Sequence, residues 1–180
     1  NFADAFELTD VINYVIISND IISPDWGIEI DDGNDGVTPA QPSLIANNFV
    51  ISNSDRALNL GDNVGATDVF HNTLLGDPAL YVNDIQPGLR VVNNILASNN
   101  DFTFEHNDAD VLDSLDYNLY YTPASNTNFA EVGGISFTDL ADLQANFSGN
   151  TNSLQGDPVF VNSLDLHVLG ALADSSATPF

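Results

Sequence analysis

Acidic side chains recur at intervals of about two dozen residues, a spacing that could assemble a cation site. Asp32, Asp62 and Asp84 each stand two positions after a short apolar segment, and His106 follows a fourth segment. If these segments stack as strands, the carboxylates lie about 4.8 Å apart and repel one another, unless a cation such as Ca²⁺ binds between them. The alternative is that Asp simply favours turns. The residues predicted to bind calcium are Asp31, Asp32, Asp35, Asp62, Asp84, Asp108 and Asp110.

A second set of candidate side chains lies in the middle of apolar-x-apolar triplets. Alternation with period two points both apolar residues into a core and the middle residue outward. The middle residues are Glu29, Asn59, Tyr81 and Thr103. We interpret them as a polar stripe with one aromatic ring that faces a glycan, and the alternative is a solvated sheet face. This register predicts that Phe102→Asp prevents folding and that Thr103→Asp is nearly silent.

Catalytic chemistry has few candidates in this chain. A lyase needs a Brønsted base and a nearby cation, and the chain offers only two Arg and three His for these roles. Arg90 is expected to pair with Asp68, since both stand four residues before a repeated Asn. A glycoside hydrolase needs two or three carboxylates in a groove, which the Asp row could imitate. Cys is absent, and no phosphate loop or zinc spacing is found, so we predict no catalytic residue.

The charge of the chain restricts its partners. Its 180 residues include 26 Asp and Glu against 2 Lys and Arg, a formal net charge of -24. Such a field repels nucleic acid, anionic membranes and polyanionic sugars. No apolar run reaches the roughly 18 residues that span a bilayer, so we predict neither nucleic acid binding nor membrane insertion. Cations, neutral glycans and other proteins are the partners that this charge allows.

A repeat anchored on Asn must position these side chains. The anchors are Asn19, Asn48, Asn72, Asn94 and Asn118, at spacings of 29, 24, 22 and 24 residues. Three residues before each anchor stands an apolar residue, in order Ile16, Ile45, Val69, Val91 and Leu115. A period of 22–24 suits a coil of a β-solenoid, and no intervening segment is long enough for a crossover helix. We predict one interior ladder of apolar residues and one of hydrogen-bonded Asn, with His71 as a turn residue.

The Asn-anchored segments resemble the repeats of right-handed parallel β-helix proteins, the group that includes pectate lyases. The tail is similar to the C-terminal end of secreted bacterial members: Tyr117-Asn118, a short helix over 139–146 capped by Thr138, then Asp157-Pro158 and a strand over 159–161. The resemblance covers roughly residues 11–170. It implies an all-β fold, a right-handed parallel β-helix of about six coils with one short C-terminal helix. It does not select a function, because this fold hosts lyases, hydrolases, adhesins and phage spikes.

We expect a single domain over 1–180, in which 135–180 supplies the C-terminal helix and closing strands. Loops over 31–43 and 122–134, rich in Gly, Pro and polar residues, should leave the tube. The first strand has no recognisable capping helix before it, so its edges are expected to be open. Two consequences stay open: further coils precede residue 1 in a longer chain, or copies stack end to end into a fibre.

These features favour a non-enzymatic extracellular or cell-surface module, structural or adhesive, with calcium in its acidic turns. The absence of Cys and Met fits a protein exposed to oxidants, and the missing Lys, the few Arg and the high Asn and Asp content fit an exposed surface protein. Its expected partners are copies of itself or coils of a longer chain, together with neutral glycans. The alternative is a carbohydrate-active enzyme, either a polysaccharide lyase or a glycoside hydrolase, or a glycan-binding fragment.

Overall fold

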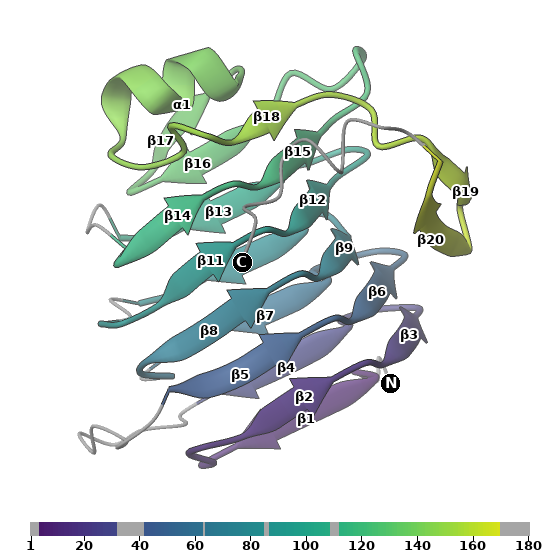
Figure 1. The fold of residues 1–180 in the computed structure, drawn as a ribbon, viewed down its shortest axis with the longest axis vertical. Coiled ribbons are helices and arrows are strands. Elements are labelled where there is room, and N and C mark those ends of the chain that lie inside the picture. The colour runs from purple at the N-terminus through teal and green to yellow at the C-terminus, as the bar shows by residue number, and fades with distance from the viewer. Residues whose placement is uncertain (1–3, 32–41, 63, 85–86, 109–111, 170–180) are drawn as a thin grey trace.

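The fold is an all-β parallel solenoid with a single short helix, as the repeat predicts. The computed structural model describes residues 4–31, 42–62, 64–84, 87–108 and 112–169. Figure 1 shows the turns lying one above another, from the first turn in purple to the last in green. The solenoid has about five turns, fewer than the six expected, because the final strands leave the tube.

Three sheets run along the tube, and neighbouring strands within them are parallel apart from β16 and β17. The seven-stranded sheet has the order β1 (Phe6–Thr9), β4 (Ile28–Asp31), β7 (Leu58–Leu60), β10 (Leu80–Val82), β13 (Phe104–His106), β16 (Ala130–Val132) and β17 (Ile135–Phe137). The five-stranded sheet has the order β14 (Ser114–Asp116), β11 (Arg90–Val92), β8 (Thr67–Phe70), β5 (Ser43–Ala46) and β2 (Val15–Ile17). The six-stranded sheet has the order β18 (Leu154–Gln155), β15 (Leu119–Tyr121), β12 (Ile95–Ala97), β9 (Thr73–Leu75), β6 (Phe49–Ser52) and β3 (Asp20–Ser23).

The core fills the tube with one apolar side chain per turn at each equivalent position. The predicted apolar ladder is confirmed, since its members are paired across successive strands and all are buried: Ile16, Ile45, Val69, Val91 and Leu115. Period-two alternation produces this arrangement, because every second side chain of a strand points into the tube. Burial of these side chains between turns is the main source of stability in a solenoid.

The Asn ladder is also confirmed. Each of the first four anchor amides donates from Nδ2 to Oδ1 of the next anchor, at 2.9 Å from Asn19 to Asn48 and at 3.2 Å from Asn94 to Asn118. The residue before each anchor has a positive φ of 56–60°, and these residues are Ser18, Asn47, His71, Asn93 and Tyr117. This left-handed backbone makes the sharp corner between two sheets. His71 is therefore a turn residue, as the repeat predicts.

The predicted register is wrong by two residues in one turn. Leu80 pairs with Phe104 and not with Phe102, so the inward pair there is Phe104 and His106. The cause is the turn between β12 and β13, residues 98–103, which is two residues longer than its counterpart at 76–79. Asp77 holds this longer turn by accepting hydrogen bonds from the backbone of Asn99 and Asn100 at 2.9 and 3.1 Å.

The C-terminal end of the tube is covered by α1 (Leu140–Asn146), which lies over the last turn in Figure 1. Leu140 and Leu143 are its buried residues. Its N-cap is Asp139 and not Thr138, because the Asp139 carboxylate accepts from the backbone N–H of Asp142 at 2.8 Å. The predicted loop over 122–134 is only partly a loop, since it includes β16, which extends the seven-stranded sheet.

The final strands form a hairpin outside the tube instead of another turn. This hairpin, β19 (Phe160–Asn162) and β20 (Asp165–Val168), is antiparallel and begins one residue later than the predicted strand over 159–161. It lies against the six-stranded sheet, where the His167 ring stacks on Phe49 with centroids 4.8 Å apart. No helix in the described part of the chain is both long and apolar enough to cross a membrane.

Candidate functional site

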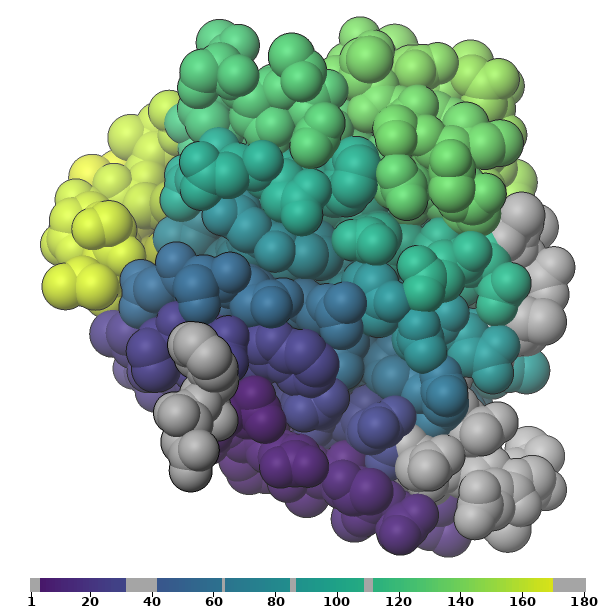
Figure 2. All heavy atoms as spheres, turned by 180° about the vertical axis from the view of Figure 1, so that it is seen from behind, coloured from purple at the N-terminus to yellow at the C-terminus, as the bar shows by residue number. Residues whose placement is uncertain are grey.

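The outward-facing positions of the seven-stranded sheet form a continuous row across the turns. Figure 2 views the molecule from the side opposite to Figure 1, where this sheet faces the reader. Pairing between strands places the following residues in the row: Glu7, Glu29, Asn59, Tyr81, Glu105 and Glu131. Three of the four predicted stripe residues are thus brought together. The fourth, Thr103, is not, because the two-residue shift places it in the turn before β13, where it is 0% exposed, and Glu105 takes its place in the row.

Arg56 covers the middle of this row. It comes from the turn before β7, and its guanidinium carbon lies 3.5 Å from the Tyr81 ring centroid and 5.0 Å from that of Trp26. Its Nη1 donates to Asn59 Oδ1 at 3.1 Å, and its Nε lies 3.7 Å from an Asp55 carboxylate oxygen. Cation–π attraction and these polar contacts hold the guanidinium in place. Asn59 and Tyr81 are therefore only 3% and 7% exposed, so the middle of the stripe is covered by protein.

Glu29 ends this chain of contacts at one side. Its Oε1 accepts from Asn59 Nδ2 at 3.0 Å. Burial, followed by the negative charge of Asp4, raises the pKa of Glu29 to about 7, although the Asn59 hydrogen bond opposes the rise. A carboxyl group with this pKa is partly protonated near neutral pH and can either donate or accept a hydrogen bond. Burial also raises the pKa of Glu105 in the same row.

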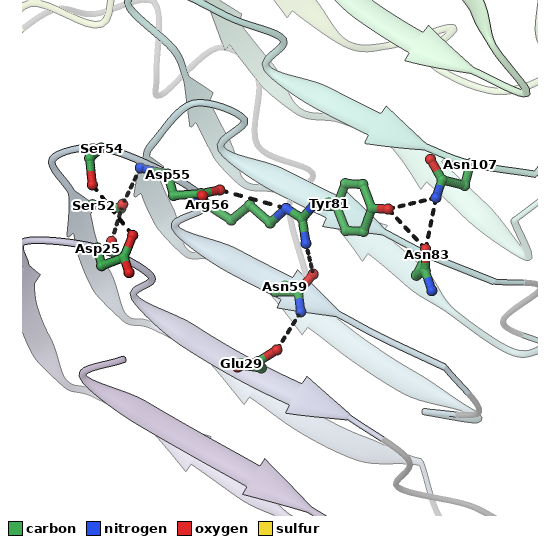
Figure 3. Close-up of polar contacts among 10 residues, drawn as sticks. All are labelled: Asp25, Glu29, Ser52, Ser54, Asp55, Arg56, Asn59, Tyr81, Asn83 and Asn107. Atoms are coloured by element: carbon green, nitrogen blue, oxygen red, sulfur yellow. Dashed lines mark hydrogen bonds and ion pairs between the residues drawn. The ribbon is translucent and has the colours of Figure 1, made fainter. Parts of the chain in front are cut away.

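Amide side chains continue the network on the far side of Tyr81, as Figure 3 shows. The Tyr81 hydroxyl donates to Asn83 Oδ1 at 2.8 Å, and Asn107 Nδ2 donates to the same oxygen at 2.7 Å. Asn83 Nδ2 in turn donates to an Asp62 carboxylate oxygen. These contacts link three successive turns through side chains alone, so the polar groups of this face are held in fixed positions.

Two hollows meet at Trp26, and we call them together the Trp26 groove. The larger, of about 530 Å³, is lined by Asp4, Asp25, Trp26, Glu29 and Asp55. The smaller, of about 210 Å³, is lined by Trp26, Glu29, Asp31, Arg56, Asn59, Gly61, Asp62, Tyr81 and Asn83. Trp26 and Glu29 belong to both hollows. An aromatic face beside carboxylate and amide groups can stack on an apolar ligand face and hydrogen-bond its hydroxyls.

Sequence reasoning missed Trp26 and the covering role of Arg56. Both stand in turns before strands, where period-two alternation gives no information. One signal was available. The only Trp of the chain and one of its two Arg stand at equivalent positions, Trp26 two residues before Ile28 and Arg56 two residues before Leu58. Strand pairing of Ile28 with Leu58 brings those turns side by side.

The predicted calcium residues are partly brought together. Asp32, Asp35 and Asp110 lie outside the described residues. Asp31 and Asp62 are neighbours, because Asp31 Oδ1 accepts from the Asp62 backbone N–H at 3.1 Å. Within the described ranges, no group of three or more His, Cys, Asp or Glu side chains could hold a metal ion. Calcium stays a prediction for these turns.

The register shift also changes which residue continues the Asp62 and Asp84 row in the next turn. Val82 pairs with His106, so the residue two positions after each, Asp84 and Asp108, occupies the same position in neighbouring turns. His106, expected in that row, instead points into the tube and is buried. The row therefore carries one more carboxylate than the sequence register implies.

The second arginine serves a different face. Arg90 Nε and Nη2 contact the two carboxylate oxygens of Asp68 at 2.6 and 2.5 Å, which confirms the predicted pair. This two-pronged geometry is the stronger form of an ion pair. Its guanidinium also lies over Phe70, on the outer side of the five-stranded sheet, so Arg90 does not reach the Trp26 groove.

The resemblance predicted from the repeats holds for the architecture, a stack of parallel strands closed into a solenoid. Comparison with protein family models, with curated proteins and with solved structures gives no match. The likeness to parallel β-helix proteins is accordingly a likeness of fold.

Proposed function

We propose that this chain is a non-enzymatic extracellular adhesive module and that its Trp26 groove binds a neutral glycan. The observation that supports this proposal best is the position of Trp26. Its half-buried ring is common to two hollows whose remaining walls are carboxylates, amides and Arg56. Sugar rings present apolar C–H faces to aromatic rings and hydroxyls to such polar groups. The net charge of -24 disfavours a polyanionic glycan.

The rigidity of the surroundings also supports binding. Glu29, Asn59 and Tyr81 stand on three paired strands, and Arg56 is clamped over them. Groups held on paired strands keep their geometry better than groups on loops, so little ordering is needed when a ligand arrives.

A fluorescence titration tests the proposal, because Trp26 is the only Trp of the chain. Neutral oligosaccharides that enter the groove should change the emission of Trp26 in a saturable way. Trp26→Ala should abolish oligosaccharide binding. Tyr121→Ala, which removes a partly exposed ring on the six-stranded sheet, should leave that binding unchanged. Equal binding by Trp26→Ala and the unmodified protein would exclude this groove as the glycan site.

A second candidate function is glycoside hydrolysis, and one observation favours it. Glu29 shares its hollow with the carboxylates of Asp25 and Asp55, and its raised pKa of about 7 suits the role of a general acid near neutral pH. Hydrolysis would produce new reducing ends from a panel of neutral polysaccharides. Glu29→Gln should remove that activity and retain binding, while an absence of products for the unmodified protein would leave binding as the function.

Self-association is the structural part of the proposal. The first-turn strands β1, β2 and β3 each lie at one end of their sheet, so each has one edge without a partner strand among the described residues. Such edges pair readily with other chains. In a fibre, the α1 end of one copy would meet the first turn of the next. Long uniform filaments in negative-stain micrographs would support this arrangement, and monodisperse monomers at high concentration would contradict it.

A further inference from the structure

A third hollow lies apart from the Trp26 groove, between the β19–β20 hairpin and the outer side of the six-stranded sheet. We call it the hairpin pocket. Its volume is about 400 Å³, within the range of pockets that hold small organic ligands. Ile22 and Phe49 of the sheet face Leu164 and Leu166 of the hairpin across it. Figure 1 shows the hairpin as an arm beside β6 and β3, separate from the stacked turns.

Most of the side chains that line the hairpin pocket are apolar, although the chain is strongly charged. Ile51 and Leu166 are buried at its back, and the Phe49 ring forms one side through its stack with His167. At the mouth, Ile22 and Leu164 are 55% and 64% exposed. Large apolar side chains left open around a hollow are typical of a surface that another molecule covers.

The polar groups of this pocket are acidic. Asp20 and Asp165 line it together with His167, whose Nδ1 lies 2.6 Å from Asp165 Oδ1. This hydrogen bond lowers the pKa of Asp165, which keeps the carboxylate ionised. Even a protonated His167 offsets only one of two negative charges. Both arginines of the chain are engaged elsewhere, Arg56 beside Tyr81 and Arg90 beside Asp68.

We propose that the hairpin pocket binds an amphiphilic organic cation, an ammonium group attached to an alkyl chain. The apolar chain contacts Ile22, Phe49 and Leu164, where it removes exposed apolar surface from water. The ammonium group lies toward Asp20 and Asp165, whose negative charge has no arginine nearby to compensate it. The negative field of the whole chain attracts a cation and repels the corresponding anion.

Calorimetric titration with four small probes tests this proposal. Octylammonium should bind at one site at least tenfold more tightly than octanol, which has the chain without the charge. Octanoate, with the opposite charge, should not bind measurably. Ethylammonium, which has the charge without the chain, should bind at least tenfold more weakly than octylammonium, which separates a specific site from general attraction of cations. Equal affinity for octylammonium and ethylammonium would overturn the proposal, as would equal affinity for octanoate.

Variants place the site. Asp20→Asn combined with Asp165→Asn should lower octylammonium affinity to that of octanol, whereas Asp10→Asn, an exposed first-turn carboxylate outside the pocket, should leave it unchanged. Ile22→Ser should weaken octylammonium and octanol alike. Circular dichroism verifies that these substitutions leave the fold intact. Undiminished octylammonium binding by the double Asp variant would overturn the assignment to this pocket.

Discussion

The buried anchor asparagines stabilise the corners of the solenoid because their side-chain polar atoms have hydrogen-bond partners, as Asn72 illustrates. Asn72 donates from Nδ2 to Asn94 Oδ1 at 3.0 Å and to the Ile45 carbonyl at 2.9 Å. Its Oδ1 accepts from the backbone and the amide of Asn48. A side chain in the middle of this ladder is thus satisfied by the turns on both sides.

Removing one ladder residue should be costly. Asn72→Ala removes the acceptor of the buried Asn48 backbone N–H and one hydrogen bond each from the Asn48 amide, Asn94 Oδ1 and the Ile45 carbonyl, and a buried group left unsatisfied costs about 1–3 kcal/mol. We expect the free energy of unfolding in urea to fall by at least about 3 kcal/mol. Asn99→Ala, which alters an exposed Asn, should change it by less than about 0.5 kcal/mol. Similar losses for both variants would contradict the importance of the ladder.

Thr103 offers a test of the register. It is fully buried and its hydroxyl donates to the Phe129 carbonyl at 2.7 Å, so Thr103→Asp should cost roughly 3 kcal/mol or more. Phe102 is only half-buried, so Phe102→Asp should cost less, the reverse of the order that the sequence register predicts. Urea denaturation of both variants measures the order. Glu105→Gln, on the outer row, is the control and should be nearly silent.

The acidity of Glu29 makes stability depend on pH. Its folded pKa of about 7 lies above the ordinary value of 4.5, so the folded state holds the proton more tightly than the unfolded state. Its contribution is therefore fully present below about pH 4.5 and is lost as the pH rises to about 7. Glu29→Gln should flatten this part of the curve of melting temperature against pH. Asp113→Asn, which removes an exposed carboxylate, should leave the slope as it is.

At the scale of elements, α1 closes the end of the core. The carboxylate of its N-cap residue, Asp139, accepts from the Asp142 backbone N–H, whereas Thr138 is exposed and stands one residue before the cap. Asp139→Ala should lower the free energy of unfolding by about 1 kcal/mol, the usual cost of a lost cap. Thr138→Ala should be close to neutral. A larger loss for Thr138→Ala than for Asp139→Ala, measured by urea denaturation, would identify Thr138 as the N-cap, as the sequence predicts.

Much of the fold could be predicted from sequence because the relevant signals are local and repeated. The spacing of Asn48, Asn72 and Asn94 predicts stacked turns, and the pairing of β6, β9 and β12 confirms it. The segment around Phe104 defeats this reasoning, because its only apolar-x-apolar triplet, Phe102-Thr103-Phe104, favours one register, whereas the strand that pairs follows a second register, Phe104-Glu105-His106, which ends in a polar residue. The length of the preceding turn decides between them, and that turn is set by Asp77, a residue of the turn below.

The candidate site was harder to predict than the strands that support it. The stripe residues Glu29, Asn59 and Tyr81 follow from alternation. The groove does not, because it depends on Trp26 and on Arg56 reaching across from a turn. The hairpin pocket could not be predicted from the sequence for a related reason. Its hairpin pairs only with itself, so no repeat spacing links Leu164 to Phe49.

At the scale of the whole molecule, charge opposes the compact state. A net charge of -24 on 180 residues produces self-repulsion, which salt screens within about 10 Å at 0.1 M. The melting temperature should therefore rise with NaCl concentration. A bound Ca²⁺ would add to this effect, so CaCl₂ should raise the melting temperature further than NaCl of equal ionic strength, and EDTA should reverse the increment. An unchanged melting temperature on chelation would contradict calcium in the acidic turns.

The Asn ladder gives the solenoid a direction. From Asn19 to Asn94, each anchor amide donates to the next anchor toward the C-terminal end, and Asn118 is the last acceptor. At the opposite end, Asn19 is exposed, and its Oδ1 is the one anchor oxygen that receives no donor from the described residues. In the end-to-end assembly proposed above, an amide group of the neighbouring copy would donate to this oxygen and so continue the ladder.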